Sequence, residues 1–458
     1  MKIAILGYGS QGQSAYEYWG RDGHDITICD LNPNTAVPDG VKSQLGPEYL
    51  DGLDRFDLII RTPILHPKDI ITANSKEILD KVTTNTNEFF RVCPTKNIIG
   101  VTGTKGKGTT ATLIAKILEA SGKTVHLGGN IGIPPLELLN DNIQPDDWVV
   151  LELANFQLID LKYSPAIAVC LMVVPEHLDW HEDFDEYITA KQQMFIHQKE
   201  ADKAIYYARN DNSIAVADAS IGQQIPYMQS PGAEVIDGKI MIAGQEICQT
   251  SDLKLLGKHN WQNVCAAITT VWFSLSSTLR DEPIGSDSNE SKVEGQITQD
   301  IDAIRSAVTA FKGLPFRIEL RREVKGVEFY NDSFATGPGA CLAAIEAITK
   351  SKVMIIGGYD RGLELSELAE GLIRNRSTIK TVILIGASAK RTAAVLKNAG
   401  FENYVLCEAK NMDEIVQFAY QSARSGDAVV LSPAFASFDM FKNFEERGLK
   451  FNEAVENL

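Results

Sequence analysis

The sequence predicts an α/β protein built from three successive units, each with a mainly parallel sheet. Three observations lead to this prediction. At 458 residues the chain is too long for one hydrophobic core of ordinary size, so several domains are expected. Short apolar runs typical of buried strands alternate with amphipathic stretches typical of helices. Glycine-rich turns stand between a strand-like run and a helix-like stretch at two places in the first half of the chain.

The first unit, residues 1–92, begins with one of these turns. The strand-like runs KIAIL, DITICD and FDLIIR alternate with helical stretches such as residues 13–21. The turn, residues 7–12, reads GYGSQG, and Asp30 ends the next strand. This context fits a dinucleotide-binding fingerprint, so the unit is predicted to be Rossmann-like. Alone, the pattern favours an NAD-dependent oxidoreductase. The same loop can hold another nucleotide diphosphate, and a turn that only packs helix on strand fits equally well.

The second unit, residues 93–313, contains the pattern of a phosphate-binding loop. Residues 98–110 read IIGVTGTKGKGTT and precede the helix-like segment TATLIAKILEA. Glycines let backbone N–H groups converge on phosphate oxygens, Lys107 adds a positive charge, and the helix that starts near Gly108 points its positive end at them. The sequence therefore predicts a nucleoside triphosphate site in a P-loop ATPase-like domain with a parallel-sheet core. The match is imperfect, because the glycine expected six residues before Lys107 is missing and Gly108 replaces a hydroxyl residue.

The third unit, residues 314–458, repeats the alternation of strands and helices. Strands are predicted within VEFYNDS, KVMIIGG, KTVILIG and DAVVLSP, and a helix over residues 340–348. This alternation predicts a second Rossmann-like domain, in which ligands would bind at the carboxyl ends of the strands. Ordinary turn chemistry also explains the polar residues there. Before this unit, the polar and acidic residues 277–298 are predicted to form a surface loop.

The composition excludes several classes of function. The net charge is −16, whereas nonspecific binding to nucleic acid or to anionic membranes needs a basic surface. The seven cysteines include no close pair, so neither a zinc cluster nor a disulfide framework is expected. No apolar run has the form of a signal peptide or the length of a membrane span. We expect a cytoplasmic protein with no nucleic-acid and no membrane partner.

Two strand ends in the second unit carry groups that bind divalent cations. Glu152 lies at the end of a strand in WVVLELANFQL, and His177 and Asp179 follow another strand in VVPEHLDWH. An oxygen and an imidazole at neighbouring strand ends could hold a divalent metal beside the triphosphate. Lys191, in DEYITAKQQMF, reads from composition alone as an ordinary solvated lysine on a helix.

Taken together, the motifs resemble those of the Mur ligase family over essentially the whole chain. The family's markers occur in order: GTKGKGTT, GGNIGIP, LELANFQL, EHLDWH, YITAK, LGKHNWQN, LPFR, NDSFAT and GGYDRG. The C-terminal segment LSPAFASFDMFKNFEERG, residues 431–448, is particularly similar to that of the members that use D-glutamate. The resemblance implies three domains, which bind a UDP-linked substrate, ATP and the incoming amino acid.

The resemblance also implies a reaction and its substrates. ATP would convert the alanyl carboxylate of UDP-N-acetylmuramoyl-L-alanine into an acyl phosphate, which the amine of D-glutamate would attack with loss of phosphate. Phosphoryl transfer needs Mg²⁺ and cations because anions must approach each other. The product is a precursor of peptidoglycan, and we expect the enzyme to be a monomer.

Individual roles follow from the same resemblance. Lys107 is expected to bind the β- and γ-phosphates, while Glu152 and His177 hold magnesium. Lys191 falls where the family has a CO₂-modified lysine, whose carbamate binds metal, and this role replaces that of a solvated lysine. The ATP-binding set is Gly103, Thr104, Lys105, Gly106, Lys107, Gly108, Thr109, Thr110, Asn260, Arg317 and Asp332. The set for the UDP-linked substrate is Gly9, Ser10, Gln11, Gly12, Asp30, Asn32 and Asn130. The set for the amino acid is Thr336, Arg361, Ser437 and Phe444.

The chain departs from the family's usual pattern near both ligands. With Gly108 lacking a hydroxyl, we predict that Thr109, Thr110 or water completes the magnesium shell. Phe334 replaces the lysine of the common DSKAT sequence, and Arg361 occupies a position that is commonly lysine. These changes leave open a related ligase for another amino acid, such as L-glutamate. Two other classes also remain: the NAD-dependent oxidoreductase, and a nucleotide-binding protein without catalytic activity.

Overall fold

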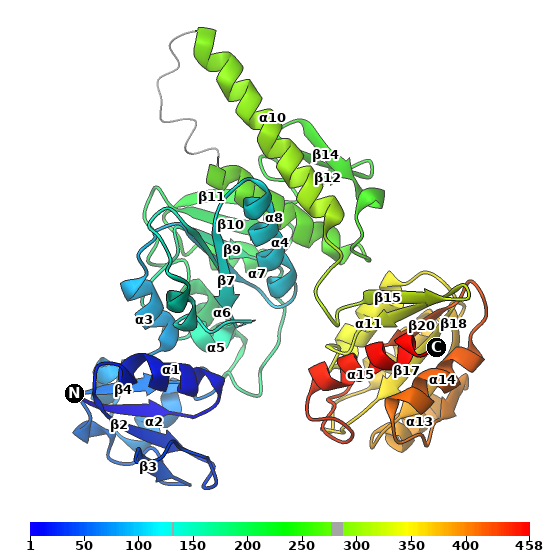
Figure 1. The fold of residues 1–458 in the computed structure, drawn as a ribbon, viewed down its shortest axis with the longest axis horizontal. Coiled ribbons are helices and arrows are strands. Elements are labelled where there is room, and N and C mark those ends of the chain that lie inside the picture. Colours follow the sequence, from blue (N-terminus) through cyan, green and yellow to red (C-terminus); the bar gives the residue numbers. More distant parts are fainter. Residues whose placement is uncertain (131, 276–286) are drawn as a thin grey trace. The chain divides into compact units, whose positions relative to one another are not determined.

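The computed structural model describes residues 1–130, 132–275 and 287–458, with the backbone alone for residues 287–298, and shows three parallel or mainly parallel sheets (Figure 1). Contacts divide the chain into two compact units. The first comprises Met1–Asp252 and Gln262–Thr309, and the second comprises Leu253–Trp261 and Ala310–Leu458. The prediction of three α/β domains with parallel sheets is confirmed. The exact boundaries at residues 92/93 and 313/314 stay predictions.

The N-terminal sheet has five parallel strands in the order β3-β2-β1-β4-β5. Strand β1 (Lys2–Leu6) lies at its centre and is buried on both faces. Ile3 and Ile5 pack into one hydrophobic core, and Ala4 and Leu6 into another. The predicted glycine turn follows this strand and leads into α1 (Ser10–Gly20). The other elements are β2 (Asp25–Asp30), β3 (Lys42–Leu45), η1 (Leu53–Arg55), β4 (Leu58–Arg61), α2 (Pro67–Ala73), η2 (Lys76–Lys81), β5 (Val82–Thr83) and α3 (Asn85–Val92).

The central sheet has six parallel strands in the order β11-β10-β9-β6-β8-β7. Strand β6 (Ile98–Thr102), which precedes the predicted phosphate loop, lies between β8 (Trp148–Glu152) and β9 (Ile167–Cys170). The carboxyl ends of these three strands therefore meet at one edge. The sheet's other elements are α4 (Lys107–Ala120), β7 (Val125–Gly129), η3 (Glu137–Asp141), α5 (Asn155–Leu158), α6 (Phe184–Gln192), β10 (Lys203–Tyr207), α7 (Asp211–Ala217) and β11 (Gln223–Tyr227).

A small antiparallel sheet and two long helices complete the first unit. The sheet joins β12 (Glu234–Ile236), β13 (Lys239–Ile242) and β14 (Gln245–Gln249), and η4 (Thr250–Asp252) follows it. Helix α8 (His259–Leu275) follows, and α10 (Asp287–Ala310) corrects the predicted loop over the residues it covers. The segment that reads as a loop also contains good helix formers, and the helix they belong to buries Ile301, Ile304 and Val308. These helix formers are Glu290, Lys292, Glu294 and Gln296. Residues 277–286 of that prediction lie outside the described residues.

The C-terminal sheet has the order β15-β16-β20-β17-β18-β19 and is parallel except for the pairing of β15 with β16. Its central strands are fully buried, and the predicted polar turns follow β16, β17 and β20. The elements are β15 (Glu319–Val324), β16 (Val327–Asn331), α11 (Pro338–Ala347), β17 (Lys352–Gly357), α12 (Ser366–Arg374), β18 (Ile379–Ile385), α13 (Ala389–Asn398), β19 (Tyr404–Leu406), α14 (Met412–Ser422), β20 (Ala428–Leu431) and α15 (Phe444–Glu456).

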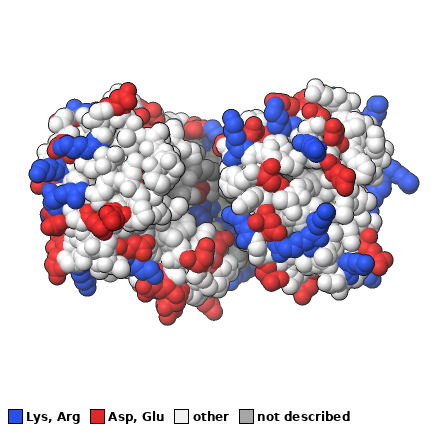
Figure 2. Space-filling model, turned by 90° about the horizontal axis from the view of Figure 1, so that it is seen from below, with Lys and Arg blue, Asp and Glu red and all other residues white. Residues whose placement is uncertain are grey.

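The surface is charged and mixed. Acidic and basic side chains are interspersed over the face shown in Figure 2. Within the described ranges, no helix has the length and apolar character that a membrane crossing requires.

Candidate functional site

The phosphate-loop motif forms a tight turn between β6 and α4. Gly103 and Gly106 have φ of +138° and +90°, a backbone region that favours glycine. A Cβ on Gly106 would lie 2.2 Å from Oδ1 of Asn263, so a larger residue there would displace that side chain and strain the backbone. The Thr104 hydroxyl lies 3.0 Å from the carbonyl of Val174 and 2.9 Å from the Tyr187 hydroxyl, and its backbone N–H donates to Met172. These contacts fix the turn to the segment after β9 and to α6.

Two lysines converge on this turn. Lys107 donates from Nζ to the carbonyl oxygens of Gly103 and Thr104 at 3.1 and 3.0 Å, and Lys191 donates to the Gly103 carbonyl at 3.2 Å. Lys191 is completely buried, with Nζ 4.3 Å from the centre of the Tyr187 ring. Its interpretation as a solvated lysine is wrong, because α6 turns this side chain inward. Burial, and then the charge of Lys107, lower the pKa of Lys191 to about 7.

Glu152 ends β8, the strand beside the phosphate-loop strand. Its side chain is buried, and Oε1 accepts a hydrogen bond from Nδ2 of Asn130 at 3.2 Å. The Asn130 backbone N–H also donates to the Glu152 carbonyl at 2.8 Å. Within the described part of the chain, Oε2 of Glu152 is buried without a hydrogen-bond partner. A buried carboxylate oxygen in that state is costly unless a cation or another group completes it.

His177 lies in the loop after β9, on a strained backbone. Its φ is +59°, in the left-handed region that non-glycine residues seldom adopt. Its ring packs edge-on against Phe156, with the ring centres 4.8 Å apart. Burial lowers the pKa of His177, and Lys107 lowers it further, while Glu176 acts in the opposite direction. The imidazole is therefore held in its neutral form, which is the form that binds metals.

These groups fit a divalent cation. The incomplete carboxylate of Glu152 and the neutral imidazole of His177 offer oxygen and nitrogen lone pairs at the carboxyl edge of one sheet. Thr109 is buried in the first turn of α4, as is Thr110, whose hydroxyl lies 3.4 Å from Oδ1 of Asn263. Lys105 is the exposed member of the turn, and Gly108 is buried in the helix start.

The N-terminal turn is held by an acid instead of by lysines. Asp30 accepts from the backbone N–H groups of Tyr8, at 2.7 Å, and Asn32, at 2.9 Å. A Cβ on Gly12 would lie 2.0 Å from the carbonyl oxygen of Gly7, whereas one on Gly9 would meet nothing within 4 Å.

Two further members of the predicted set complete this turn. Ser10 is exposed at the start of α1. The carbonyl oxygen and Oε1 of Gln11 accept from Nδ2 of Asn85, at 2.8 and 3.1 Å.

The second compact unit, which contains the C-terminal sheet, carries a separate group of predicted residues at its strand ends. Asp332 is buried and accepts from the Ser432 hydroxyl at 2.6 Å and from the backbone N–H of Ile318 at 3.1 Å. Burial raises the pKa of Asp332 to about 7, although these hydrogen bonds oppose the shift. The Arg317 guanidinium lies 3.9 Å from the centre of the Phe334 ring, a cation–π contact.

The predicted amino-acid set lies on the same loops. Arg361 is exposed and donates to the carbonyl oxygen of Thr336 at 3.0 Å. Phe444 begins α15 and packs edge-on against Phe334, with ring centres 4.9 Å apart. Ser437 is buried in the turn after β20. These loops thus bring an arginine and aromatic rings together within one unit.

The predicted ATP-binding residues are divided between the two units. The loop residues 103–110 belong to the first, whereas Asn260, Arg317 and Asp332 belong to the second. Asn260 donates from Nδ2 to the carbonyl of Leu256 at 2.7 Å.

Sequence reasoning missed two residues that shape these sites. Asn263, on the first-unit part of α8, contacts the phosphate loop, and its spacing of three from Asn260 on one helix was an available signal. Arg447 is buried in α15 and donates to the Ser333 hydroxyl and carbonyl and to the Phe435 carbonyl, at 2.9 to 3.1 Å. No local pattern distinguishes it from an exposed arginine.

Comparisons with known proteins agree along the whole chain. The Mur ligase middle domain matches residues 101–271, and the Mur ligase glutamate ligase domain matches residues 316–435. The UDP-N-acetylmuramoylalanine–D-glutamate ligase of Clostridium tetani is 34% identical over 473 residues, which cover 100% of this chain and 97% of that protein. The protein of the same name from Acetivibrio thermocellus is 34% identical over 478 residues, covering 100% of this chain and 96% of that protein.

Solved structures show the same fold at lower identity. The MurF ligase of Thermotoga maritima in complex with ADP has a TM-score of 0.58 and 16% identity, over 99% of this chain and 95% of that one. A pseudomurein peptide ligase type C from Methanothermus fervidus has a TM-score of 0.55 and 18% identity, over 100% of this chain and 99% of that one.

Proposed function

Because the chain belongs to the Mur ligase family, we propose that it is an ATP-dependent, ADP-forming acid–amino-acid ligase that adds D-glutamate to UDP-N-acetylmuramoyl-L-alanine in peptidoglycan synthesis. One observation carries this conclusion. Proteins named for that substrate pair are 34% identical to this chain over its full length. The strand-end residues described above are suited to the chemistry. We place the enzyme in the cytoplasm, as a monomer, with domain boundaries at residues 92/93 and 313/314.

The reaction must make a carboxylate reactive. A carboxylate is a poor electrophile until it carries a good leaving group, and ATP supplies one by phosphorylating the alanyl carboxylate. The backbone N–H groups of residues 105–108 at the start of α4 would receive the phosphates, and Lys107 would neutralise charge on the β- and γ-phosphates. The amine of D-glutamate then attacks the acyl phosphate, and phosphate leaves from the tetrahedral intermediate.

We assign a magnesium site to Glu152 and His177, with Thr109, Thr110 or water in place of the hydroxyl that Gly108 lacks. The orphan Oε2 of Glu152 and the neutral imidazole of His177 support this assignment. When bound, Mg²⁺ would polarise phosphate oxygens and offset the repulsion between anions. Around it, Lys107 holds the turn closed through the carbonyl oxygens of residues 103 and 104.

We further propose that Lys191 carries a carbamate. Carbamate formation needs an unprotonated amine, and the buried Lys191 has a pKa of about 7. The modification would turn a buried cation into an anion beside the metal site and would remove the electrostatic conflict with Lys107.

The substrate sites follow the two Rossmann-like domains. We assign the UDP-linked substrate to Gly9, Ser10, Gln11, Gly12, Asp30, Asn32 and Asn130. We assign the amino acid to Thr336, Arg361, Ser437 and Phe444, and the remaining ATP contacts to Asn260, Arg317 and Asp332. An arginine at 361 can bind a carboxylate with two parallel hydrogen bonds, which lysine cannot do.

A coupled phosphate-release assay with purified UDP-N-acetylmuramoyl-L-alanine and a panel of amino acids tests the function. We expect release only when ATP, the UDP-linked substrate and D-glutamate are all present. Turnover with L-glutamate instead would favour the related ligase that Phe334 and Arg361 leave open. ATP binding without turnover for any amino acid would mean a catalytically inactive nucleotide-binding protein.

A further inference from the structure

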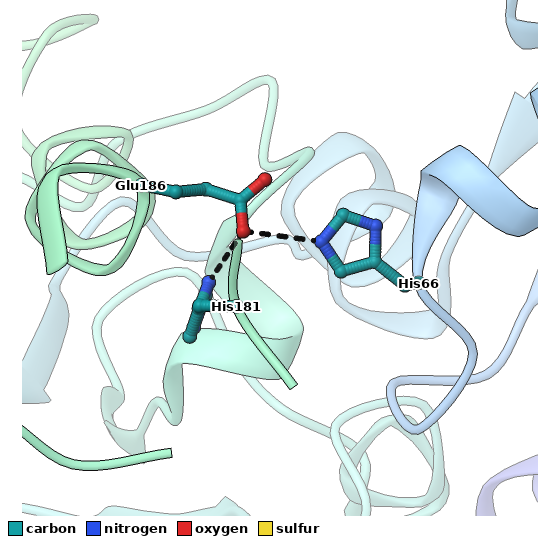
Figure 3. Close-up of side chains that lie close together, drawn as sticks. All are labelled: His66, His181 and Glu186. Atoms are coloured by element: carbon teal, nitrogen blue, oxygen red, sulfur yellow. Dashed lines mark hydrogen bonds and ion pairs between the residues drawn. The ribbon is translucent and has the colours of Figure 1, made fainter. Parts of the chain in front are cut away.

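Two buried histidines and a partly buried glutamate outside the predicted sites form a compact cluster between the N-terminal and central sheets. Nε2 of His66 lies 3.3 Å from Oε2 of Glu186, and Nδ1 of His181 lies 3.0 Å from the same oxygen (Figure 3). The backbone N–H of Glu182 donates to it as well, at 2.9 Å. His66 and His181 are 5% and 3% exposed, so the two rings are shielded from water, while the Glu186 carboxylate is partly exposed.

The ring nitrogens that face away from Glu186, here called the outer nitrogens, distinguish a carboxylate bridge from a metal site. The backbone N–H of Lys68 donates to Nδ1 of His66 at 3.1 Å, and Nδ2 of Asn155 lies 2.8 Å from Nε2 of His181. Each outer nitrogen therefore accepts, so each neutral ring carries its proton on the nitrogen that faces Glu186. A metal ion would need lone pairs at those two positions. The hydrogen bonds thus favour a carboxylate bridge over a metal site, although two histidines and a carboxylate are a common metal-binding set.

One end of the bridge is a rigid loop of the N-terminal domain. His66 caps α2, and residues 62–65 precede it. The buried Arg61 donates to the carbonyl oxygens of residues 62, 63 and 65 and forms a two-point ion pair with Asp160, at 2.6 and 2.7 Å. This loop is therefore fixed to the central domain independently of Glu186.

The other end is the loop that carries His177. His181 and Trp180 donate from their backbone N–H groups to the carbonyl of His177, at 3.0 and 3.1 Å. The Trp180 ring packs against His66 and Phe156, with ring centres 4.4 and 4.8 Å apart, and its indole N–H donates to the carbonyl of residue 64. Phe156 in turn contacts the His177 ring. A histidine held in the left-handed region needs such support, because its backbone conformation is costly.

We propose that Glu186 is a positioning residue for the ligase reaction: by bridging His66 and His181 it fixes the loop of His177, and so sets the enzyme's affinity for Mg²⁺. This inference rests on the proposed function for its link to magnesium. It assigns to α6 a second task, since the same helix carries Lys191.

Glu186→Ala tests the proposal, with Asp185→Ala as the matched control. Asp185 lies beside Glu186 in the first turn of α6, is exposed and carries the same charge. We expect Glu186→Ala to raise the Mg²⁺ concentration needed for half-maximal activity by about tenfold. This is the lower end of the loss of affinity seen when a hydrogen-bond partner of a metal ligand is removed. The KM for D-glutamate should not change, and Asp185→Ala should behave as the wild type. Glu186→Gln keeps a carbonyl oxygen whose two lone pairs can accept from His66 and His181, and it should restore part of the affinity.

A pair of variants at His66 examines the other end of the bridge. Glutamine can still donate to Glu186 from its amide, whereas asparagine can still cap α2 but cannot reach Glu186. We expect the higher Mg²⁺ requirement in His66→Asn and not in His66→Gln. Hydrogen exchange of residues 175–182 without substrates gives a readout independent of activity, and we expect faster exchange in Glu186→Ala and His66→Asn.

Three results would overturn the proposal. The first is an unchanged Mg²⁺ requirement in a folded Glu186→Ala. The second is a parallel loss of affinity for Mg²⁺, ATP and D-glutamate, which would indicate general damage. The third is stoichiometric Zn²⁺ binding by the wild type that Glu186→Ala abolishes. If the wild type has no ligase activity but Glu186→Ala still loosens residues 175–182, the proposed function fails while the bridge stands.

Discussion

The two glycine-rich turns of the first unit share a backbone plan but have opposite electrostatic surroundings. Each follows the central strand of a parallel sheet, contains a left-handed glycine after that strand, and leads into a helix. At the N-terminal turn the charged partner is Asp30, whose carboxylate accepts backbone N–H groups. At the central turn the partners are Lys107 and Lys191, which converge on the carbonyl of Gly103.

This difference shows what glycine spacing can and cannot specify. Glycines determine how closely a ligand's phosphates can approach the backbone, and both turns allow that approach. The charged side chains then decide which ligand is favoured. Lysines suit the concentrated charge of a triphosphate, whereas a carboxylate can accept hydrogen bonds from the hydroxyl or N–H groups of a nucleotide-linked ligand.

Removing the charge from the central turn should have the largest effect. We expect Lys107→Ala to lower ligase turnover by about 1000-fold, the upper range for a group that stabilises transition-state charge. Calorimetric binding of UDP-N-acetylmuramoyl-L-alanine should not change, because the N-terminal turn keeps its own supports. Lys116→Ala, which removes an exposed lysine farther along α4 and outside the assigned sites, is the control and should remain active. Substantial turnover in Lys107→Ala would mean that the central turn does not handle the phosphates.

The second lysine should matter almost as much, for a different reason. We expect Lys191→Ala to lose about 100-fold in activity, comparable with the loss of a strong outer partner of a metal. Added short carboxylic acids should restore part of it, because they can occupy the space of the carbamate. Phosphate release measured against formate or acetate concentration checks this. Full activity of the variant without added acid would refute the assignment of a carbamate.

The pKa of Lys191 makes the modification dependent on pH. Below about pH 7 its amine is protonated and cannot react with CO₂; above that pH it is neutral. We expect the carbamate signal from ¹³C-labelled bicarbonate in NMR spectra to rise as the pH increases through about 7. An ordinary lysine, with a pKa of about 10.4, would show the rise far higher. A signal that remains in Lys191→Ala belongs to another amine.

The contrast between the turns also indicates how much the sequence can predict. Both turns, their strands and their helices were predictable, because apolar runs and glycines are local signals. The burial of Lys191 was not, since a lysine on a helix carries no sign of which face packs inward. The contact between His66 and Glu186 joins residues 120 positions apart, and such pairings depend on how two domains pack. Helix α10 was missed because its residues favour both loops and helices.

The N-terminal turn can be broken by a single methyl group. Gly12→Ala would place a Cβ 2.0 Å from the carbonyl oxygen of Gly7, so the backbone must shift. We expect the KM for the UDP-linked substrate to rise about tenfold and stability to fall by about 1–3 kcal/mol, as in other overpacked sites. The KM for ATP should stay within twofold of the wild-type value, which corresponds to a change of at most about 0.4 kcal/mol in binding free energy. Gly9→Ala, where nothing lies within 4 Å of the new Cβ, separates a steric effect from a general intolerance of side chains.

Changing the charge of the N-terminal turn should have the smallest effect, but it tests directly which ligand this turn binds. Asp30→Asn keeps one oxygen for the backbone N–H of Tyr8 but turns an amide toward that of Asn32, so one hydrogen bond is lost. We expect a rise of about threefold in the KM for the UDP-linked substrate, equivalent to about 0.65 kcal/mol, with no change in the KM for ATP. Fluorescence titration with NADH should show no saturable binding to either protein. Saturable binding of NADH to the wild type that Asp30→Asn weakens would show that the acid at this turn selects a dinucleotide after all. In that case the N-terminal turn would bind a dinucleotide, and the assignment of the UDP-linked substrate to this turn would be wrong.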